Sequence, residues 1–174
     1  MRAQLTTKRL VLRAPRRDDA AIYAARIGNP AVARFLDPVP LPYSVEMARE
    51  WMKTLPDQPG PENATFVVEL PDAGLIGAVG IRNELGYWFA EPHWGKGYAT
   101  EACTAVIDWF FARSDVDRIS SGTHIDNPAS ANVQRKLGFV VVGHTDKYSE
   151  ARQCMVPHIV TALTRTAWFG RTPS

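Results

Sequence analysis

The sequence has few cysteines, no long apolar run and no excess of charge of one sign, and each lack excludes a class of protein. With only Cys103 and Cys154 in 174 residues, a disulfide-rich scaffold is excluded and free thiols in a reducing compartment are expected. No apolar run approaches the roughly 18 residues of a membrane-spanning helix, so no membrane partner is expected. The net charge is only +2 and no basic run occurs, so nucleic acid is not expected as a partner either.

The chain also lacks a targeting segment and internal repeats. Residues 1–19 contain only short apolar pieces separated by arginines, which is not the pattern of a secretory signal peptide. No repeat of about 20–50 residues and no low-complexity segment is present. A cytoplasmic protein with a single domain over residues 1–174 is therefore expected, and the sequence leaves open whether it is a monomer or a homodimer.

The strongest local pattern joins a strand, a glycine loop and a helix between residues 84 and 111. Aromatic and β-prone residues come first, a segment with Gly95 and Gly97 ends the strand, and apolar residues recur at helical spacing over 99–111. The first turn of a helix has unpaired N–H groups and partial positive charge, and glycines let an anion approach them. Lys96 adds a positive charge, so the expected ligand is a phosphate or pyrophosphate. The spacing of the glycines alone is equally compatible with an ordinary connecting loop. It matches neither a P-loop nor the dinucleotide-binding fingerprint.

Alternation, helical spacing and turn residues predict a strand, two helices, three strands, a helix, a strand, a helix and two strands. This order indicates the α+β class, with a mixed, mostly antiparallel sheet flanked by helices. Strands are expected over 5–13, 65–70, 75–82, 84–90, 117–125, from 139 to about 143 and over 157–164; helices are expected from Asp18 or Asp19 to about Gly28, from Ser44 to Leu55, over 99–111 and from Asn127 to Gly138, with a short one over 32–36.

Two separate motifs resemble the GNAT superfamily of acyl-CoA-dependent N-acetyltransferases. The string Trp-Gly-Lys-Gly-Tyr-Ala-Thr-Glu-Ala over 94–102 is similar to the loop of the RimJ/RimL-type branch, the ribosomal-protein N-acetyltransferases, in which tryptophan replaces the usual glutamine or arginine. The second motif is Asn127-Pro-Ala-Ser130 followed by Lys136-Leu-Gly-Phe139. The predicted order of strands also fits this superfamily, so the resemblance extends over nearly the whole chain.

The resemblance implies a sheet splayed between the strands over 84–90 and 117–125, with acetyl-CoA as acyl donor in the splay and no metal. The pantetheine arm would pair with the edge of the first of these strands, and the pyrophosphate would lie on the amides of the glycine loop. The implied cofactor-binding residues are Phe89, Ala90, Trp94, Gly95, Lys96, Gly97, Tyr98, Ala99, Thr100, Asn127 and Lys136, with Arg135 near the CoA phosphates.

The acid that assists the leaving thiolate is the less definite part of the implied site. Many members of the superfamily use a tyrosine four residues before the glycine of Leu-Gly-Phe, and here that position is Gln134, which cannot serve as an acid. In the RimJ/RimL-type branch a serine in the Asn-x-x-Ser pattern is the candidate, and it matches Ser130. Read from its position alone, Ser130 is a serine in the first turn of a helix that bonds to backbone.

The resemblance implies a carboxylate base near the start of the central strand, and Glu84 is the candidate; a solvated glutamate at a strand start is the alternative. Phe35, Tyr43 and Tyr87 are expected to contact the acceptor, Tyr87 and its neighbour Trp88 pointing to opposite faces of their strand. The four histidines lack metal-ligand spacing, so no metal site is expected and structural roles are predicted for them. His124, at a strand end beside the splay, is the histidine to examine.

The hypothesis is an N-acetyltransferase that transfers the acetyl group of acetyl-CoA to a primary amine by direct attack on the thioester. The acceptor is a protein N-terminus or a small amine, and the sequence does not choose between them. The alternative is a catalytically silent domain that binds or senses acyl-CoA, which the missing tyrosine at Gln134 favours. Amine-dependent release of free CoA distinguishes the two.

Overall fold

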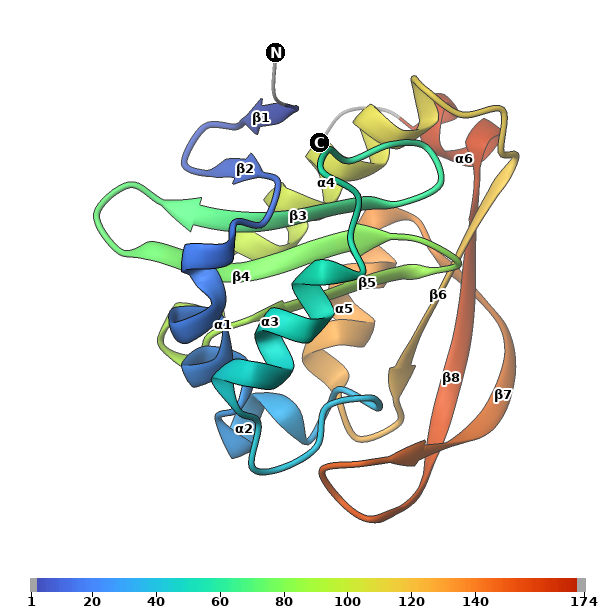
Figure 1. The fold of residues 1–174 in the computed structure, drawn as a ribbon. Helices are drawn as coiled ribbons and strands as arrows, with labels where there is room; N and C mark the ends of the chain where they lie inside the picture. Colours follow the sequence, from blue (N-terminus) through green and yellow to red (C-terminus); the bar gives the residue numbers. More distant parts are fainter. Residues whose placement is uncertain (1–2, 172–174) are drawn as a thin grey trace.

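A mixed sheet of eight strands forms the centre of the computed structural model, which describes residues 3–171 (Figure 1). The strand order is β1-β2-β3-β4-β5-β6-β8-β7, and within the described chain β5 and β6 are the only parallel neighbours. This confirms the mixed, mostly antiparallel sheet. The strands are β1 Gln4–Thr6, β2 Val11–Arg13, β3 Ala64–Leu70, β4 Gly74–Ile81, β5 Leu85–Phe89, β6 Arg118–His124, β7 Val140–Ser149 and β8 Cys154–Thr164.

Helices cover both faces of this sheet. In Figure 1, α1 and α3 lie in front of it, and α4 and α5 lie behind it. The helices are α1 Ala20–Ile27, α2 Pro30–Ala33, α3 Val45–Lys53, α4 Tyr98–Phe111, α5 Pro128–Leu137 and α6 Arg165–Gly170, with short 3-10 turns at Arg17–Asp19 and Glu91–His93. No helix within residues 3–171 is both long and apolar enough to cross a membrane.

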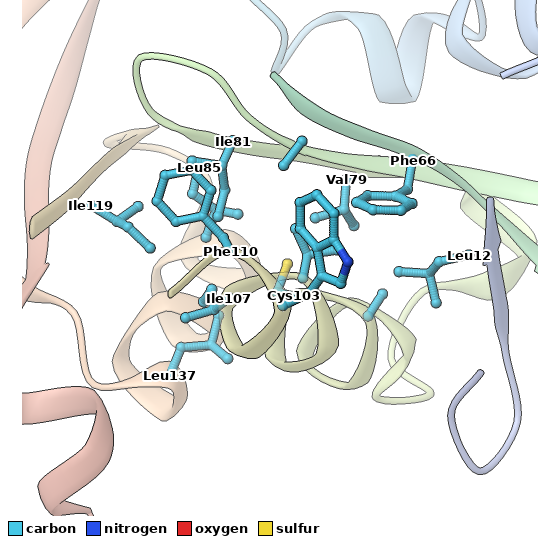
Figure 2. Close-up of a cluster of buried hydrophobic side chains, with 14 of the residues drawn as sticks. Leu12, Phe66, Val79, Ile81, Leu85, Cys103, Ile107, Phe110, Ile119 and Leu137 are labelled. Atoms are coloured by element: carbon cyan, nitrogen blue, oxygen red, sulfur yellow. The ribbon is translucent and has the colours of Figure 1, made fainter. Parts of the chain in front are cut away.

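Two buried clusters correspond to the two covered faces, because successive side chains of a strand point to opposite sides. Phe66 packs with α4, whereas its neighbour Val67 packs with α1 and α3. Figure 2 shows Cys103, Ile107 and Phe110 of α4 pointing toward the strands that carry Phe66 and Val79. The helical spacing predicted over 99–111 therefore buries one face of α4 against the sheet.

The predicted starts of α3 and α5 are confirmed, and a side chain caps each of them. The Ser44 hydroxyl accepts a hydrogen bond from the Met47 amide at 3.1 Å at the start of α3, and Asn127 caps α5 in the same way. Gly138 ends α5 with φ +91°, a conformation that favours glycine. These boundaries depend on neighbouring residues only, so the sequence predicts them.

Residues 5–13 do not form the single strand that their alternation predicts. They belong to β1 and β2, which pair antiparallel with Leu5 opposite Leu12, and the chain reverses where the Thr7 amide bonds to the Leu10 carbonyl at 2.9 Å. Side chains alternate between the two faces of the sheet in β1 and in β2 as they would in one longer strand. The period-2 pattern therefore does not reveal that the chain reverses.

Smaller differences concern the ends of elements. Helix α2 lies over Pro30–Ala33 instead of 32–36, because Asn29 caps it and accepts from the Ala31 amide at 2.9 Å. The Asp19 carboxylate does not cap α1, because it bonds to the Arg13 guanidinium at 2.8 Å. The apolar side chain of Ile22 in α1 is 37% exposed and lies outside the buried face of this helix. That face consists of Ala20, Tyr23, Ala24 and Ile27. In the β7–β8 hairpin, β7 continues to Ser149 instead of ending near 143, and β8 begins at Cys154 instead of 157. Helix α6 was not predicted.

Candidate active site

Strands β5 and β6 share a single register pair and then diverge. Leu85 lies opposite Ser121, and the Ser121 hydroxyl donates a hydrogen bond to the Leu85 carbonyl at 2.8 Å. β6 instead pairs along its whole length with β8 on its other side. The expected splay between these two strands is thus present, and it opens toward their C-terminal ends.

The backbone groups of β5 that face the splay follow from its pairing with β4. The Ala90 amide donates to the Ile76 carbonyl at 2.8 Å, so the groups of Ala90 point toward β4. Since orientation alternates along an antiparallel strand, the groups of Tyr87 and Phe89 point toward the splay. Phe89 therefore lies at the open edge as expected, whereas the Ala90 amide is already used. The Phe89 carbonyl also accepts from the Trp94 indole nitrogen at 2.6 Å, so Trp94 ties the loop to this strand.

The glycine loop leads into an uncapped helix. Gly95 and Gly97 have φ of +72° and +80°, in the left-handed region where a side chain is strained. No side chain among the described residues 3–171 caps α4, so the amides of Tyr98, Ala99 and Thr100 are available to an outside anion. In contrast, side chains cap α2, α3, α5 and α6. A pyrophosphate at this loop stays a prediction, and the free amides and left-handed glycines are the features that it requires.

Arg9, which the sequence reasoning missed, adds a second cation beside Lys96 at this loop. Its guanidinium donates to the Lys96 carbonyl at 2.9 Å and lies 4.4 Å from the centre of the Tyr98 ring. It reaches the loop because the turn between β1 and β2 lies against the start of α4. No local signal marks this contact, since 87 residues separate Arg9 from Lys96.

Glu101 fastens that turn to α4. Its carboxylate accepts from the Thr7 hydroxyl at 2.6 Å, from the Arg9 amide at 2.9 Å and from the Arg9 Nε at 2.7 Å. Burial favours the neutral acid and by itself raises the pKa of Glu101. The hydrogen bonds from Thr7 and Arg9 favour the charged carboxylate more strongly, so the pKa of Glu101 is lowered. The charged carboxylate therefore stabilises the frame of the loop.

We expect Glu101→Gln to lower the free energy of unfolding at pH 7 by about 1–3 kcal/mol, because hydrogen bonds to a charged group are lost. A lowered folded-state pKa means that this stabilisation is fully present above the pKa of the unfolded state. It is lost as the pH falls through the folded-state pKa. Urea unfolding at pH 7 and in acid should therefore show a deficit that shrinks in acid.

The matched control for this prediction is Glu50→Gln on the exposed side of α3. Within residues 3–171, Glu50 forms an ion pair only with Lys53 of the next turn, and both side chains are 61% exposed. Its replacement should change the free energy of unfolding by less than about 0.5 kcal/mol at either pH. An equal deficit for Glu101→Gln at both pH values would show that the charge of Glu101 is not the stabilising feature.

Ser130 and Tyr87 meet beside the splay on the face covered by α4 and α5. The Tyr87 hydroxyl lies 2.8 Å from the Ser130 hydroxyl, and burial raises the pKa of Tyr87 above its ordinary value, so the phenol is protonated at neutral pH. Trp88 points to the other face, where its indole nitrogen donates to the Tyr23 hydroxyl at 3.3 Å. Tyr87, expected to contact the acceptor, is thus a neighbour of Ser130.

Gln134 has a structural role. Its side chain is buried, donates to the Gly122 carbonyl at 2.8 Å and accepts from the Thr161 hydroxyl at 2.7 Å. These bonds join α5 to β6 and β8. The side chain of Gln134 thus serves to hold α5 against these strands, and an amide is not an acid.

A cluster of charged and titratable residues lies on the opposite face of the splay. His124 Nε2 is 2.7 Å from Asp37 Oδ1, and His158 Nε2 is 3.3 Å from Asp37 Oδ2. Lys147 Nζ lies 3.2 Å from Glu84 Oε1 and 3.9 Å from Asp37 Oδ2. We call these five residues the Asp37 cluster. The sequence marks Glu84 and His124, but Asp37, His158 and Lys147 come from distant segments that no motif singles out.

The remaining predicted site residues lie around these two groups. Asn127 uses its side-chain oxygen to cap α5, and its side-chain nitrogen makes no hydrogen bond with residues 3–171, so it is available to a ligand. Lys136 and Arg135 are exposed on α5. Phe35 packs against the His124 ring at 6.1 Å between centroids, whereas Tyr43 packs with the cluster around α1 and α3.

The arrangement thus has two sides. One side offers an anion-binding helix start, open strand-edge groups and the Ser130–Tyr87 pair, which together fit a phosphate-bearing thioester. The other side offers carboxylates and histidines, which fit an amine and its proton. The two sides meet where β5 and β6 diverge after their single register pair.

Comparisons with known proteins agree with this geometry. A family model described as the acetyltransferase (GNAT) domain matches residues 9–140. The uncharacterized N-acetyltransferase p20 of Bacillus licheniformis is 26% identical over 176 residues, which cover 95% of this chain and 98% of that protein.

Solved structures share the fold. The ribosomal-protein-S5-alanine acetyltransferase from Vibrio fischeri superposes with a TM-score of 0.78 at 22% identity, covering 98% of this chain and 100% of that chain. The spermidine N-acetyltransferase from Vibrio cholerae, solved in complex with CoA and spermine, has a TM-score of 0.77 at 22% identity, covering 94% and 99%. At such identities the likeness establishes the fold and leaves the acceptor open.

Proposed function

Because the chain belongs to the GNAT acetyltransferase family, we propose that its acceptor is the primary amine of a protein N-terminus. Members of this family transfer acetyl groups from acetyl-CoA to amines. The similarity to a ribosomal-protein-S5-alanine acetyltransferase supports a protein acceptor. A small polyamine is the second candidate, because a spermidine N-acetyltransferase has the same fold.

The donor side of the proposal is carried by the uncapped start of α4 behind Gly95 and Gly97. The pyrophosphate of acetyl-CoA would accept hydrogen bonds from the free amides there, and the helix dipole, Lys96 and Arg9 would offset its charge. The pantetheine arm would then follow the open edge of β5 and reach the Asn127 side chain. This path brings the thioester to the splay.

In the proposed reaction the amine nitrogen attacks the thioester carbonyl carbon directly, and the tetrahedral intermediate collapses with cleavage of the C–S bond. We assign to Ser130 the hydrogen bond that stabilises the leaving sulfur. The Tyr87 hydroxyl lies 2.8 Å from the Ser130 hydroxyl, and when Tyr87 is the donor of this bond, the Ser130 hydroxyl hydrogen is free to point at the leaving thiolate. Because a thiolate is a good leaving group, a hydrogen bond of this kind suffices.

Glu84 is placed on the acceptor side. Its carboxylate is half-exposed and holds the ammonium of Lys147, so it is suited to bind the ammonium form of an incoming amine. The Asp37 carboxylate lies on the other side of that ammonium. A positively charged N-terminus or polyamine would compete with Lys147 for these two carboxylates.

The test is calorimetry with acetyl-CoA followed, in the same buffer, by measurement of free CoA released with different amines. The panel contains a peptide that begins with alanine, the same peptide with a blocked N-terminus and an internal lysine, and spermidine. Micromolar binding with turnover of the free N-terminus alone supports the proposal. Turnover of spermidine alone would replace the acceptor, and binding without amine-dependent turnover would favour the silent acyl-CoA sensor.

A further inference from the structure

His124 occupies a position that packing alone does not explain. Its side chain is 1% exposed, and its Nε2 lies 2.7 Å from Asp37 Oδ1. A carboxylate only accepts, so the proton is on Nε2 and the lone pair is on Nδ1. Nδ1 is buried and has no hydrogen-bond partner within residues 3–171. A buried acceptor without a donor costs about 1–3 kcal/mol, so the unpaired nitrogen calls for a functional reason.

The position of His124 supplies that reason. It ends β6, where the splay is open, and its carbonyl accepts from the amide of Asn127, the residue assigned to the pantetheine arm. Ile119 of the same strand packs toward α4, and alternation places His124 on the opposite face. It contacts Asp37 and Phe35 there, both from the segment after α2. His124 is thus beside the thioester path but on the acceptor side.

We propose that His124 is the general base that takes the proton of the acceptor amine at Nδ1, and that Asp37 is a positioning residue that fixes the imidazole and stabilises its charged form. This inference rests on the proposed function and names a further residue of the same site. The division of roles is that of a histidine–carboxylate pair, in which the carboxylate holds one ring nitrogen and the other accepts the proton.

The step balances when it starts from the neutral amine, so an amine bound as ammonium first releases one proton to solvent. The amine lone pair forms the new C–N bond, one N–H proton passes to His124 Nδ1, and the C–S electron pair leaves with the sulfur. The imidazolium keeps its Nε2–H bond to Asp37 and later releases the proton to solvent. Because Nδ1 is buried, neighbouring side chains have to move before the amine reaches it; the rings of His158 and Phe35 pack against the imidazole at 4.4 and 6.1 Å between centroids.

Four charged or titratable groups around His124 decide its protonation state. They are Asp37 from the segment after α2, His158 on β8, Arg152 of the β7–β8 turn, and Lys147 on β7, which reaches Asp37. Burial is the largest influence and lowers the pKa of His124; Asp37 raises it, and His158 and Arg152 lower it further. The net lowering leaves the ring neutral at pH 7, which is the state a base requires.

Asp37, His124 and His158 also resemble a metal-ligand set, but the geometry favours a proton. Two donor atoms bound to one tetrahedral zinc ion at about 2.0–2.1 Å lie roughly 3.3 Å apart. His124 Nε2 and Asp37 Oδ1 are 2.7 Å apart, which is a hydrogen-bond distance. The ammonium of Lys147, 3.9 Å from Asp37 Oδ2, further opposes a cation.

The experiment measures kcat against pH at saturating acetyl-CoA and amine for the wild type, His124→Gln, Asp37→Asn, Glu84→Gln and the control His144→Gln. We expect kcat of His124→Gln to fall by about 100-fold or more and its acid limb to disappear, with unchanged affinity for acetyl-CoA as the test of folding. In Asp37→Asn the acid limb should move to lower pH, since the carboxylate raises the pKa of His124. His144, exposed on β7, should behave as the wild type.

A second measurement does not depend on activity. Long-range proton–nitrogen NMR correlations should show His124 with its hydrogen on Nε2 and with an unprotonated Nδ1. If His124→Gln keeps the wild-type rate and acid limb, or if Glu84→Gln alone loses that limb, His124 is not the base. One tightly bound metal ion per chain that is lost in His124→Gln would also overturn the inference. Absence of turnover in the wild type with every amine would contradict the proposed function itself.

Discussion

Gly97→Glu is expected to weaken acetyl-CoA binding by roughly 100-fold or more. Gly97 has φ +80° immediately before the uncapped first turn of α4, so any side chain is strained there. A Cβ would lie 3.4 Å from the Arg9 Nη2, in the space assigned to the pyrophosphate. The new carboxylate would also repel the phosphates, and like charges a few ångströms apart at a protein surface repel by several kcal/mol. Calorimetry with acetyl-CoA measures the effect.

Two controls separate charge from backbone strain. Gly97→Ala adds strain without charge and should weaken binding much less. Gly74 has φ +67° at the start of β4, and a Cβ at this position would have no neighbour within 4 Å, so Gly74→Glu adds the same strain and charge away from the loop. It should cost stability and leave acetyl-CoA affinity unchanged. Wild-type affinity in Gly97→Glu would remove the pyrophosphate from this loop.

Ser130→Ala is expected to lower kcat by about 100-fold, at the low end for acid catalysis because a thiolate leaves readily. The affinity for acetyl-CoA should change little, because the hydroxyl acts on the sulfur as the C–S bond breaks. The cap of α5 should persist, since it is formed by the Ser130 backbone amide and the Asn127 side chain. Steady-state kinetics of CoA release together with calorimetry give the two quantities.

Tyr87→Phe tests the same assignment from its neighbour. It removes the hydroxyl that lies 2.8 Å from the Ser130 hydroxyl while keeping the ring in place. If Tyr87 orients Ser130, kcat should fall, but by less than in Ser130→Ala, and the double variant should add little to Ser130→Ala. Full turnover in Ser130→Ala would show that the thiolate leaves without help from this residue.

The glycine loop, the starts of α3, α4 and α5 and the fold class could be predicted from the sequence because each depends on residues close together in the chain. Gly97 and the helix that follows it are contiguous, and so are Asn127 and Ser130, whose cap forms across three residues. The physical causes are local: backbone freedom at glycine, unpaired amides at a helix start and a side chain that reaches its own backbone. The mostly antiparallel sheet also followed from the order of elements.

Contacts across the sheet could not be predicted in this way. The reversal inside residues 5–13 is invisible to alternation, and it carries Arg9 to the glycine loop. Tyr87 and Trp88 were expected on opposite faces, but only the packed sheet shows that Tyr87 is the one beside Ser130. The Ala90 amide donates its hydrogen bond to β4 and not toward the splay, because the register between β4 and β5 decides which residues of β5 face β4.

The sequence by itself determined the family, the class of fold and the glycine loop that is proposed to bind the acyl donor. These follow from contiguous motifs in which each residue acts on its immediate neighbours. Only the tertiary structure decided how the acceptor side is built. Asp37 and His124 lie 87 residues apart in the chain, and His158 and Lys147 come from the last hairpin. Their meeting results from the folding of that hairpin and of the segment after α2 against the splay, which no local pattern encodes.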